Sequence, residues 1–317
     1  MSSRKSMKSM NFWRENEVFG KRAFVILLET SGCSWRSCYM CGYNYKRTCE
    51  KSDQDLINQI ESALLNYKDE DMIKIFTSGS FLDDSEINTK AREKIMDLLP
   101  ATGKLITIES RPEFVTEKTL ETLKGRNIEV AIGLESSNNM VLKNCVNKGF
   151  KVEDFVEASK KVSNYGFKRK AYLLLKPPFL SEKEALIDLK NSIDFASRYA
   201  DTISINPVNI QNGTLVKRLW IERKYRPPWL WSLVDALIYS QKYVGKGKVV
   251  VSMPSGAGRE RGIHNCFACD SEIIKKMDNC RIKQNYDDLK DLSCDCIEKW
   301  KDSLALEKYV FGNPIYP

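Results

Sequence analysis

The chain has 317 residues, 42% of them hydrophobic and 29% charged, and its 50 basic and 42 acidic side chains give a formal net charge of +8. This composition excludes a disordered chain, because it supplies enough apolar surface for a sizeable core. No apolar segment approaches the roughly 20 residues that cross a bilayer, and the amino-terminal MSSRKSMKSM lacks the hydrophobic stretch of a signal peptide. We therefore expect a cytoplasmic protein without a membrane partner.

Residues 1–22 carry an excess of basic side chains, so we expect a solvated amino-terminal extension there, or an arm for an anionic partner. From residue 23 onward, short apolar runs alternate with segments of helical periodicity. This alternation predicts a parallel α/β sheet, and a partial (β/α)6-type barrel fits it best. A doubly wound sheet stays open, because sequence does not give strand order. The expected strands cover residues 23–29, 72–77, 105–110, 128–134, 171–176, 202–207 and 248–253.

The alternation ends near residue 254, where Cys, Asp and Lys become frequent. We therefore expect three parts: the basic extension 1–22, a barrel over 23–253, and a small Cys-rich C-terminal module over 254–317. In either sheet architecture, functional groups lie in loops at the carboxyl ends of the strands. Ten cysteines in a reducing compartment indicate metal binding rather than disulfides, with Cys49 and Cys145 as unligated thiols.

The loop after the first expected strand reads ETSGCSWRSCYMCGYNYKR and holds Cys33, Cys38 and Cys41. A structural zinc ion takes four protein ligands, so three thiols in one loop leave a position unfilled. A [4Fe-4S] cluster held by three cysteines has one open iron, which can bind S-adenosylmethionine and pass an electron to its sulfonium to release a carbon radical. A cluster whose fourth ligand comes from elsewhere is the alternative.

This loop resembles that of the radical S-adenosylmethionine superfamily, although its C-x4-C-x2-C spacing departs from the usual C-x3-C-x2-C. Seven further segments, in the same order over nearly the whole chain, are similar to the family of the radical subunit of archaeosine synthase. They are FTSGSFLDDSEI, IESRPEF, GLESSNN, LLKPPFLSE, NGTLVKRLW, RPPWLW and HNCFACD. The resemblance implies a radical S-adenosylmethionine barrel, in which the three cysteines hold the catalytic cluster.

The resemblance also implies contacts to the cofactor at the strand ends. Ser78, Gly79 and Ser80 occupy the position where the superfamily commonly has Gly-Gly-Glu, which binds the methionine amino group. The departure from that motif leaves the individual contacts of the two serines open. Met40 would pack near the adenine, with simple core filling as the alternative.

Further cofactor contacts are expected after the third and fourth strands. Glu109 or Ser110 would face the ribose, and Glu135 would accept hydrogen bonds from ribose hydroxyls or instead cap the next helix. Arg111 would hold a carboxylate or form a surface salt bridge. Lys176 would reach the mouth of the barrel, or only extend its amine to solvent.

The C-terminal module contains two pairs of closely spaced thiols. Brought together, they would form a tetrahedral zinc site that replaces a missing apolar core. Cys280 and His264, the only histidine, are rival ligands, and a second iron-sulfur cluster or unligated thiols are the alternatives. The four thiols belong to Cys266, Cys269, Cys294 and Cys296.

The resemblance implies a transfer RNA substrate, in which a partner enzyme has attached lysine to a 7-deazaguanine of the D-loop region. The radical would take hydrogen from the lysine carbon beside the linking nitrogen, and C–N cleavage would leave the amidine of archaeosine. This reaction makes the protein a lyase that needs an electron donor. The alternatives are another radical tRNA-modifying enzyme, methylthiolase-like or wobble-uridine modifying, and a non-catalytic iron-sulfur and zinc scaffold that binds RNA.

Basic side chains with aromatic neighbours are compatible with RNA, because cations contact phosphates and rings stack on bases. Such patches are also common as solvated helix faces. The basic members are Lys160, Lys161, Lys168, Arg169, Lys170, Lys217, Arg218, Arg223, Lys224, Arg226, Arg259 and Arg261, and the aromatic members are Tyr165, Phe167, Trp220, Tyr225 and Trp229.

Overall fold

The structure is a computed structural model that describes residues 11–45, 51–100 and 103–307. Its strands form one eight-stranded sheet in the order β1 to β8, with each strand hydrogen-bonded to its neighbour in sequence. β1 is antiparallel to β2, and all later pairs are parallel. The strands are β1 (Phe12–Asn16), β2 (Arg22–Leu27), β3 (Met72–Phe76), β4 (Leu105–Ser110), β5 (Asn127–Glu135), β6 (Lys168–Leu175), β7 (Thr202–Pro207) and β8 (Val249–Val251).

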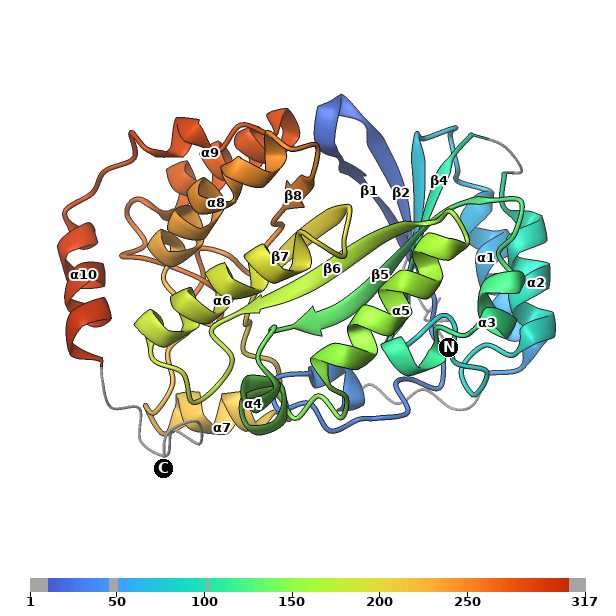
Figure 1. Cartoon of the computed structure of the whole chain (residues 1–317), viewed down its shortest axis with the longest axis horizontal. Helices are drawn as coiled ribbons and strands as arrows, with labels where there is room; N and C mark the ends of the chain where they lie inside the picture. Colours follow the sequence, from blue (N-terminus) through green and yellow to red (C-terminus); the bar gives the residue numbers. More distant parts are fainter. Residues whose placement is uncertain (1–10, 46–50, 101–102, 308–317) are drawn as a thin grey trace, which may run out of the picture.

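Helices lie along the outside of the curled sheet, with α1 and α2 at one end and α8 at the other (Figure 1). Within the described ranges, every helix is too short or too polar to span a bilayer. The helices are α1 (Asp53–Leu64), α2 (Thr89–Leu98), α3 (Glu117–Glu121), α4 (Asn139–Val141), α5 (Val152–Asn164), α6 (Glu182–Ala196), α7 (Leu215–Ile221), α8 (Leu230–Val244), α9 (Asp270–Lys283) and α10 (Cys296–Leu306). Short helical turns are η1 (Val18–Gly20), η2 (Gly42–Tyr45), η3 (Pro112–Phe114), η4 (Leu142–Val146) and η5 (Asp287–Leu289).

The partial barrel expected from the sequence is confirmed. The consecutive order of the strands means that each crossover adds the next strand on the same side. A doubly wound sheet would reverse this direction at a switch point, so that alternative is excluded. The local sequence supports the elements: the strand cores are aliphatic, and α1 and α6 begin with capping boxes at Ser52 and Ser181.

The expected basic extension is in part a strand. Residues 12–16 pair along β2, with Trp13 opposite Val25 and Glu15 opposite Ala23. Its FWREN sequence lacks the apolar run of the other strands, because Glu15 faces a polar interior while Arg14, on the opposite face, pairs with Glu70. Residues 1–10 of the extension, like Cys49, lie outside the described residues.

The Cys-rich segment packs directly on the barrel. α9 contacts η1 and α8, and α10 contacts α6. The buried Tyr286 donates a hydrogen bond to the Val250 carbonyl of β8 at 2.6 Å. The Gln284 side chain accepts a hydrogen bond from the Val250 amide and donates one to the Val250 carbonyl. In residues 254–307, therefore, the segment shares one hydrophobic core with the barrel.

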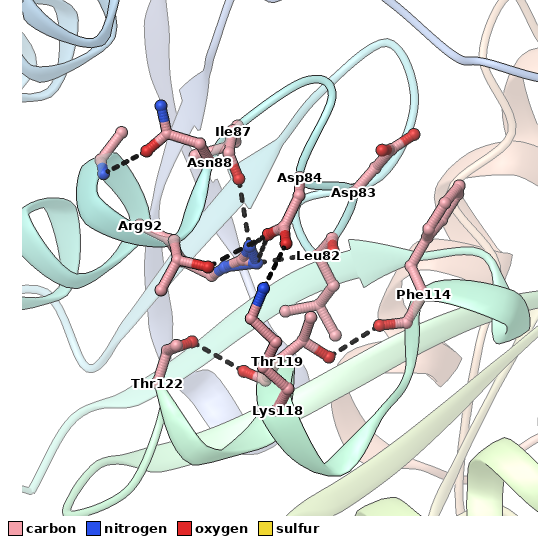
Figure 2. A network of polar contacts seen from close by, with 12 residues as sticks. Leu82, Asp83, Asp84, Ile87, Asn88, Arg92, Phe114, Lys118, Thr119 and Thr122 are labelled. Carbon is pink, nitrogen blue, oxygen red and sulfur yellow. Dashed lines mark hydrogen bonds and ion pairs between the residues drawn. The ribbon is translucent and has the colours of Figure 1, made fainter.

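A buried arginine holds the loop between β3 and α2 (Figure 2). Arg92 on α2 is fully buried, and its guanidinium donates to the Ile87 carbonyl at 3.1 Å and to the Leu82 carbonyl. It also pairs with the Asp84 carboxylate, which accepts a further bond from Lys118 of α3 at 3.1 Å. These contacts fix the loop whose first residues are the Ser78 to Ser80 turn.

We expect Arg92→Leu to lower the free energy of unfolding by about 3–5 kcal/mol, because it leaves buried carbonyls without a donor and a charge without its partner. Urea denaturation followed by circular dichroism measures the change. Lys118→Ala is the control, because it removes an exposed bond to the same carboxylate that contributes about 0–1 kcal/mol. Equal losses in the two variants would contradict the assignment.

Candidate functional site

The three cysteines lie in the loop between β2 and α1, at the carboxyl end of β2. Cys33, Cys38 and Cys41 are all partly buried. The Arg36 guanidinium donates to the Cys33 carbonyl at 2.7 Å, so the first cysteine is fixed from within the loop. The three thiols are therefore held at the edge of the sheet where parallel α/β proteins place their sites.

The segment after β5 holds the other side of the cysteine loop. The Tyr39 amide donates to the Val146 carbonyl at 3.0 Å, and the Trp35 indole donates to the Asn147 carbonyl at 2.7 Å. The Trp35 ring lies so close to Gly149 that an added Cβ would sit 2.5 Å from a ring atom. The loop is thus braced by a chain segment more than 100 residues away in sequence.

Charged groups of both signs act on the thiol of Cys38. Burial raises the pKa of this thiol to about 11, Lys148 and Arg111 act to lower it, and Cys41 and Glu135 act to raise it. Lys148 pairs with Glu135 at 2.7 Å. A cluster held by three thiolates is anionic, and buried anions need nearby positive charge. The donor set and its cations therefore fit the [4Fe-4S] cluster implied by the sequence.

The turn after β3 packs on the cysteine loop. A Cβ on Gly79 would lie 2.7 Å from the Cys33 Cα and would overlap the Glu86 carboxylate, so only glycine fits. Glu86 accepts hydrogen bonds from the Thr30 hydroxyl and the Ser80 amide, both at 2.7 Å. Burial raises the pKa of the Glu86 carboxyl to about 7. Glu86 lies within the segment FTSGSFLDDSEI, but its role in holding this turn was not expected from the sequence.

A cavity of about 590 Å³, named here the inner cavity, lies inside the curl of the sheet. Of the expected cofactor contacts, Glu109 and Glu135 line it. The hydroxyls of the buried Ser80 and Ser110 bond instead to the backbone of Arg111, at 3.1 and 2.9 Å. Three further residues expected to contact the cofactor, all of them described in the structure, do not line the inner cavity. They are Met40, Ser78 and Gly79.

Arg111 and Lys176 are both occupied by neighbouring side chains. Arg111 pairs with Glu113 at 2.5 Å and lies over the Trp35 ring. Lys176 is buried and pairs with Glu182 at 2.8 Å. Neither cation therefore extends freely into solvent.

The inner cavity contains an ionic group that no motif identified. The buried Lys74 of β3 pairs with Glu15 of β1 at 2.6 Å and also with Glu17. Lys74 interrupts the apolar run MIKIF of β3. A lysine in the middle of a strand that is otherwise buried on both faces indicates a polar interior, and this was the sequence signal for the ionic group.

Two further interior groups come from β4 and β6. Glu109 hydrogen-bonds with the Tyr172 side chain, and burial raises the pKa of its carboxyl to about 7. Lys170 also lines the inner cavity, with its amine 5.6 Å from the centre of the Tyr172 ring. The sequence analysis grouped Lys170 with the RNA-facing cations, and the structure corrects this: its side chain points into the barrel.

The C-terminal thiols converge. Their four sulfur atoms lie within 4.8 Å of one another, and three of the six separations are 3.6 to 3.8 Å. Tetrahedral zinc with bonds of about 2.3 Å places its sulfurs about 3.8 Å apart, so the spacing suits one metal ion. The Trp231 indole donates to one of the sulfurs at 3.2 Å. The group comprises Cys266, Cys269, Cys294 and Cys296.

The two rival ligands lie elsewhere. His264 bonds the Gly262 carbonyl through Nδ1 at 2.8 Å and stacks on the Phe267 ring. Cys280 is buried in the core on the inner side of α9. Neither residue belongs to the thiol group, which among the described residues is the one set of clustered His, Cys, Asp or Glu ligand atoms.

The expected RNA-binding residues are only partly on the surface. Phe167 and Tyr225 are buried in the core and cannot stack on a base. A second cavity, of about 600 Å³, lies beside the loops that follow β6 and β7, and several of the expected cations line it. Its lining includes Trp220, Arg223, Lys224, Arg226 and Glu260.

Comparison with known proteins identifies the class first. The model of the radical SAM superfamily matches residues 28–189. The fold is similar to the solved structure of an N-terminally truncated Elp3 of Methanocaldococcus infernus, with a TM-score of 0.53 at 17% identity over 84% of this chain and 65% of that one.

Two curated relatives narrow the class. The chain is 40% identical to archaeosine synthase subunit beta of Methanosarcina acetivorans, over 93% of this chain and 88% of the relative. It is 38% identical to archaeosine synthase subunit beta of Thermococcus kodakarensis, over 92% and 95% of the two chains. The chain belongs to the radical SAM superfamily and, within it, to the archaeosine synthase subunit beta family.

We expect Glu109→Gln to remove a pH dependence of stability in the cofactor-free protein. Folding raises the pKa of this carboxyl from 4.5 to about 7, so the native state retains a proton that the unfolded chain releases. Wild-type stability should therefore fall as the pH rises from about 4.5 to 7. Glu109→Gln should match the wild type at pH 4 and exceed it at pH 8 by about 3 kcal/mol.

Urea denaturation at the two pH values, without S-adenosylmethionine, measures this difference. Glu157→Gln on α5 serves as the control, because Glu157 is exposed and its replacement should change neither value. A stability difference between Glu109→Gln and the wild type that stays constant from pH 4 to 8 would show that Glu109 does not titrate in this range.

Proposed function

We propose that this protein is the radical subunit that completes archaeosine in transfer RNA. Its substrate is a 7-deazaguanine in the D-loop region that carries a lysine, attached beforehand by a partner enzyme through the lysine side-chain nitrogen. The observation that carries the proposal is the 40% identity to archaeosine synthase subunit beta over 93% of the chain. The relative's name as a subunit supports the partner enzyme.

In this proposal Cys33, Cys38 and Cys41 hold a [4Fe-4S] cluster that binds S-adenosylmethionine. The two cofactors, once bound, supply the carbon radical that takes a hydrogen atom from the lysine carbon beside the linking nitrogen. The carbon radical would then lose a second electron, which the oxidised cluster would take up, and water would add to the resulting iminium carbon. The C–N bond then breaks: the nitrogen stays on the base as an amidine, and the lysine carbon leaves as an aldehyde whose oxygen comes from that water. S-adenosylmethionine is the net two-electron oxidant, and an external donor would reduce the cluster before the first turnover.

The protein's own groups position these components. Glu109 and Glu135 line the inner cavity and bind cofactor hydroxyls. At neutral pH the carboxyl of Glu109 can donate as well as accept, because its pKa is about 7. Lys148 and Arg111 offset the negative charge of the cluster, and their charges already act on the Cys38 thiol. The closely packed turn at Gly79 fixes the first cysteine.

We assign the transfer RNA contact to the surface around the second cavity. Its cations follow β6 and β7, so they lie at the same edge of the sheet as the cysteine loop. Arg261 lies over the Trp220 ring at 5.3 Å, an arrangement that offers both a charge for phosphate and a face for stacking. A tRNA held here would lead its modified base toward the inner cavity. A substrate of this kind places the protein in the cytoplasm.

We assign zinc to the four C-terminal thiols. Sulfur separations of 3.6 to 3.8 Å suit a closed tetrahedral site, which leaves no position for a substrate. Backbone amides of Cys269 and Ala268 lower the pKa of the Cys266 thiol to about 7, whereas burial raises the pKa of the Cys269 and Cys296 thiols. The ion therefore serves structure, joining the segment around α10 to the barrel.

The reduced protein should convert lysine-bearing transfer RNA to archaeosine and form 5′-deoxyadenosine, as measured by mass spectrometry of digested nucleosides. The Cys33/Cys38/Cys41 triple Ala variant should lose both products, by at least about a thousandfold, because no cluster remains to supply the radical. Electron paramagnetic resonance of the reduced wild type should shift when S-adenosylmethionine is added. An unchanged spectrum would mean that the fourth iron is already ligated, and the scaffold alternative would replace the enzyme.

Cys266→Ser should lose the C-terminal metal, from about one zinc ion per chain to a small fraction, and should lower the melting temperature by several degrees. Metal analysis and thermal denaturation measure both effects. Cys280→Ala is the matched control, because it also removes a thiol and should keep its zinc. Loss of zinc from Cys280→Ala alone would show a different ligand set, and iron in the wild type would show a different metal.

A further inference from the structure

The inner cavity has an electrostatic asymmetry that cluster and cofactor binding do not explain. Lys170 is only 7% exposed and lines this cavity. In the described part of the chain, its amine makes no hydrogen bond and no ion pair within 4.0 Å, and its close contact is the Tyr172 ring at 5.6 Å. A buried cation without a direct ion pair is costly, so this position is suited to an anionic group of a ligand.

The opposite wall of the inner cavity has excess negative charge. Lys74 is shared between Glu15 and Glu17, so these three side chains sum to one negative charge. The groups line the cavity from β1 and β3, whereas Lys170 lines it from β6. A ligand with an ammonium and a carboxylate at one end would complement both walls.

Other charged groups of the inner cavity compensate Lys170 only from a distance: its charge acts to lower the pKa of the Glu15 and Glu109 carboxyls, but it forms no ion pair with either. Glu135 is paired with Lys148 at 2.7 Å. Glu109 is engaged by Tyr172, and its raised pKa, about 7, leaves it only partly charged at neutral pH. Both act on the interior, and neither forms an ion pair with the Lys170 amine.

Depth in the barrel separates this charge pattern from the methionine end of the cofactor. Lys170 precedes the last residue of β6, Leu175, by five positions, which is roughly 16 Å along the strand. Glu15 lies opposite Ala23, near the start of β2, while the cysteine loop leaves the end of that strand. The opposed charges are thus far from the edge where the methionine group of the cofactor would meet the cluster.

We propose that the inner cavity binds the α-amino-acid end of the appended lysine, with the carboxylate on Lys170 and the ammonium on the Glu15 and Glu17 wall. This inference rests on the proposed function. Because lysine is joined to the base through its side-chain nitrogen, its α-amino and α-carboxylate groups are free and lie at the far end from the reacting carbon. Binding that end deep in the barrel places the reacting carbon nearer the cysteine loop.

The first test changes the substrate and leaves the protein intact. A transfer RNA carrying 1,5-diaminopentane in place of lysine lacks only the carboxylate. Wild-type kcat/KM for archaeosine formation should be roughly 10- to 100-fold lower with this RNA, the usual effect of losing a charged hydrogen bond. A transfer RNA carrying 6-aminohexanoate lacks only the α-ammonium and should also react more slowly.

The second test changes Lys170. Lys170→Met should lose about the same 10- to 100-fold on the lysine-bearing RNA and should no longer distinguish it from the 1,5-diaminopentane RNA. Lys170→Arg should restore part of the discrimination, because it keeps the charge. Lys94→Met on α2 removes an exposed lysine and should behave as the wild type. An unchanged spectral shift with S-adenosylmethionine would show that Lys170→Met is folded and binds the cofactor.

The outcomes separate the two proposals. A wild type that processes the lysine and 1,5-diaminopentane RNAs equally well overturns this inference and leaves the proposed function standing. A Lys170→Met variant that still discriminates as strongly as the wild type also overturns it. A wild type that binds S-adenosylmethionine but converts neither RNA overturns the proposed function, and this inference with it.

Discussion

The site depends on how the loop that carries Cys33, Cys38 and Cys41 is held, because that loop has little secondary structure of its own. A parallel sheet brings the carboxyl ends of its strands to one edge, so loops distant in sequence can brace one another. Here a carbonyl of the segment after β5 accepts a hydrogen bond from the Tyr39 amide. The turn after β3 packs so closely on the cysteine loop that a single added methyl group would not fit between them. The curl of the sheet therefore determines where the thiols lie.

The same curl leaves a polar interior. The interior of a closed eight-stranded barrel is filled by layers of aliphatic side chains, whereas this open sheet encloses a cavity of about 590 Å³ with charges from β1, β3, β4 and β6. These charges are arranged in pairs across the strands, as Lys74 is with Glu15. Buried ion pairs contribute little to stability by themselves, so their presence agrees better with ligand recognition than with folding.

The sequence predicted the fold well, because strand and helix periodicity is a local property. All seven expected apolar runs became strands, β2 to β8. The strand at residues 12–16 was missed because the polar interior had replaced its apolar pattern. The same cause explains why Lys170 was grouped with surface cations: a lysine in a strand gives no local sign of which way its side chain points.

The candidate site could be predicted only where its residues lie close together in the sequence. The thiol pairs at Cys266 and Cys294 are spaced closely enough to be recognised, and the structure brings them together across 28 positions. Lys148 comes from a loop that meets the cysteines only in space, so no spacing could identify it, whereas Glu86 lies inside the segment FTSGSFLDDSEI but was not recognised as a site residue. Ser80 and Ser110 matched a motif position, yet their hydroxyls serve the backbone of the protein.

The thiol group lies beside a series of polar contacts that leads to the mouth of the barrel: Trp231, which donates to the Cys296 sulfur, is the neighbour in sequence of Ser232. The Trp300 indole of α10 donates to Ser232 at 2.9 Å, Ser232 donates to Glu182 at 2.5 Å, and Glu182 pairs with Lys176 just beyond β6. An ion that binds only the folded thiol group stabilises everything packed on it by mass action. The supply of that ion in the cell would thus affect the local stability of the barrel mouth. In metal-depleted protein, the residues at the entrance to the cavity would lose their order first.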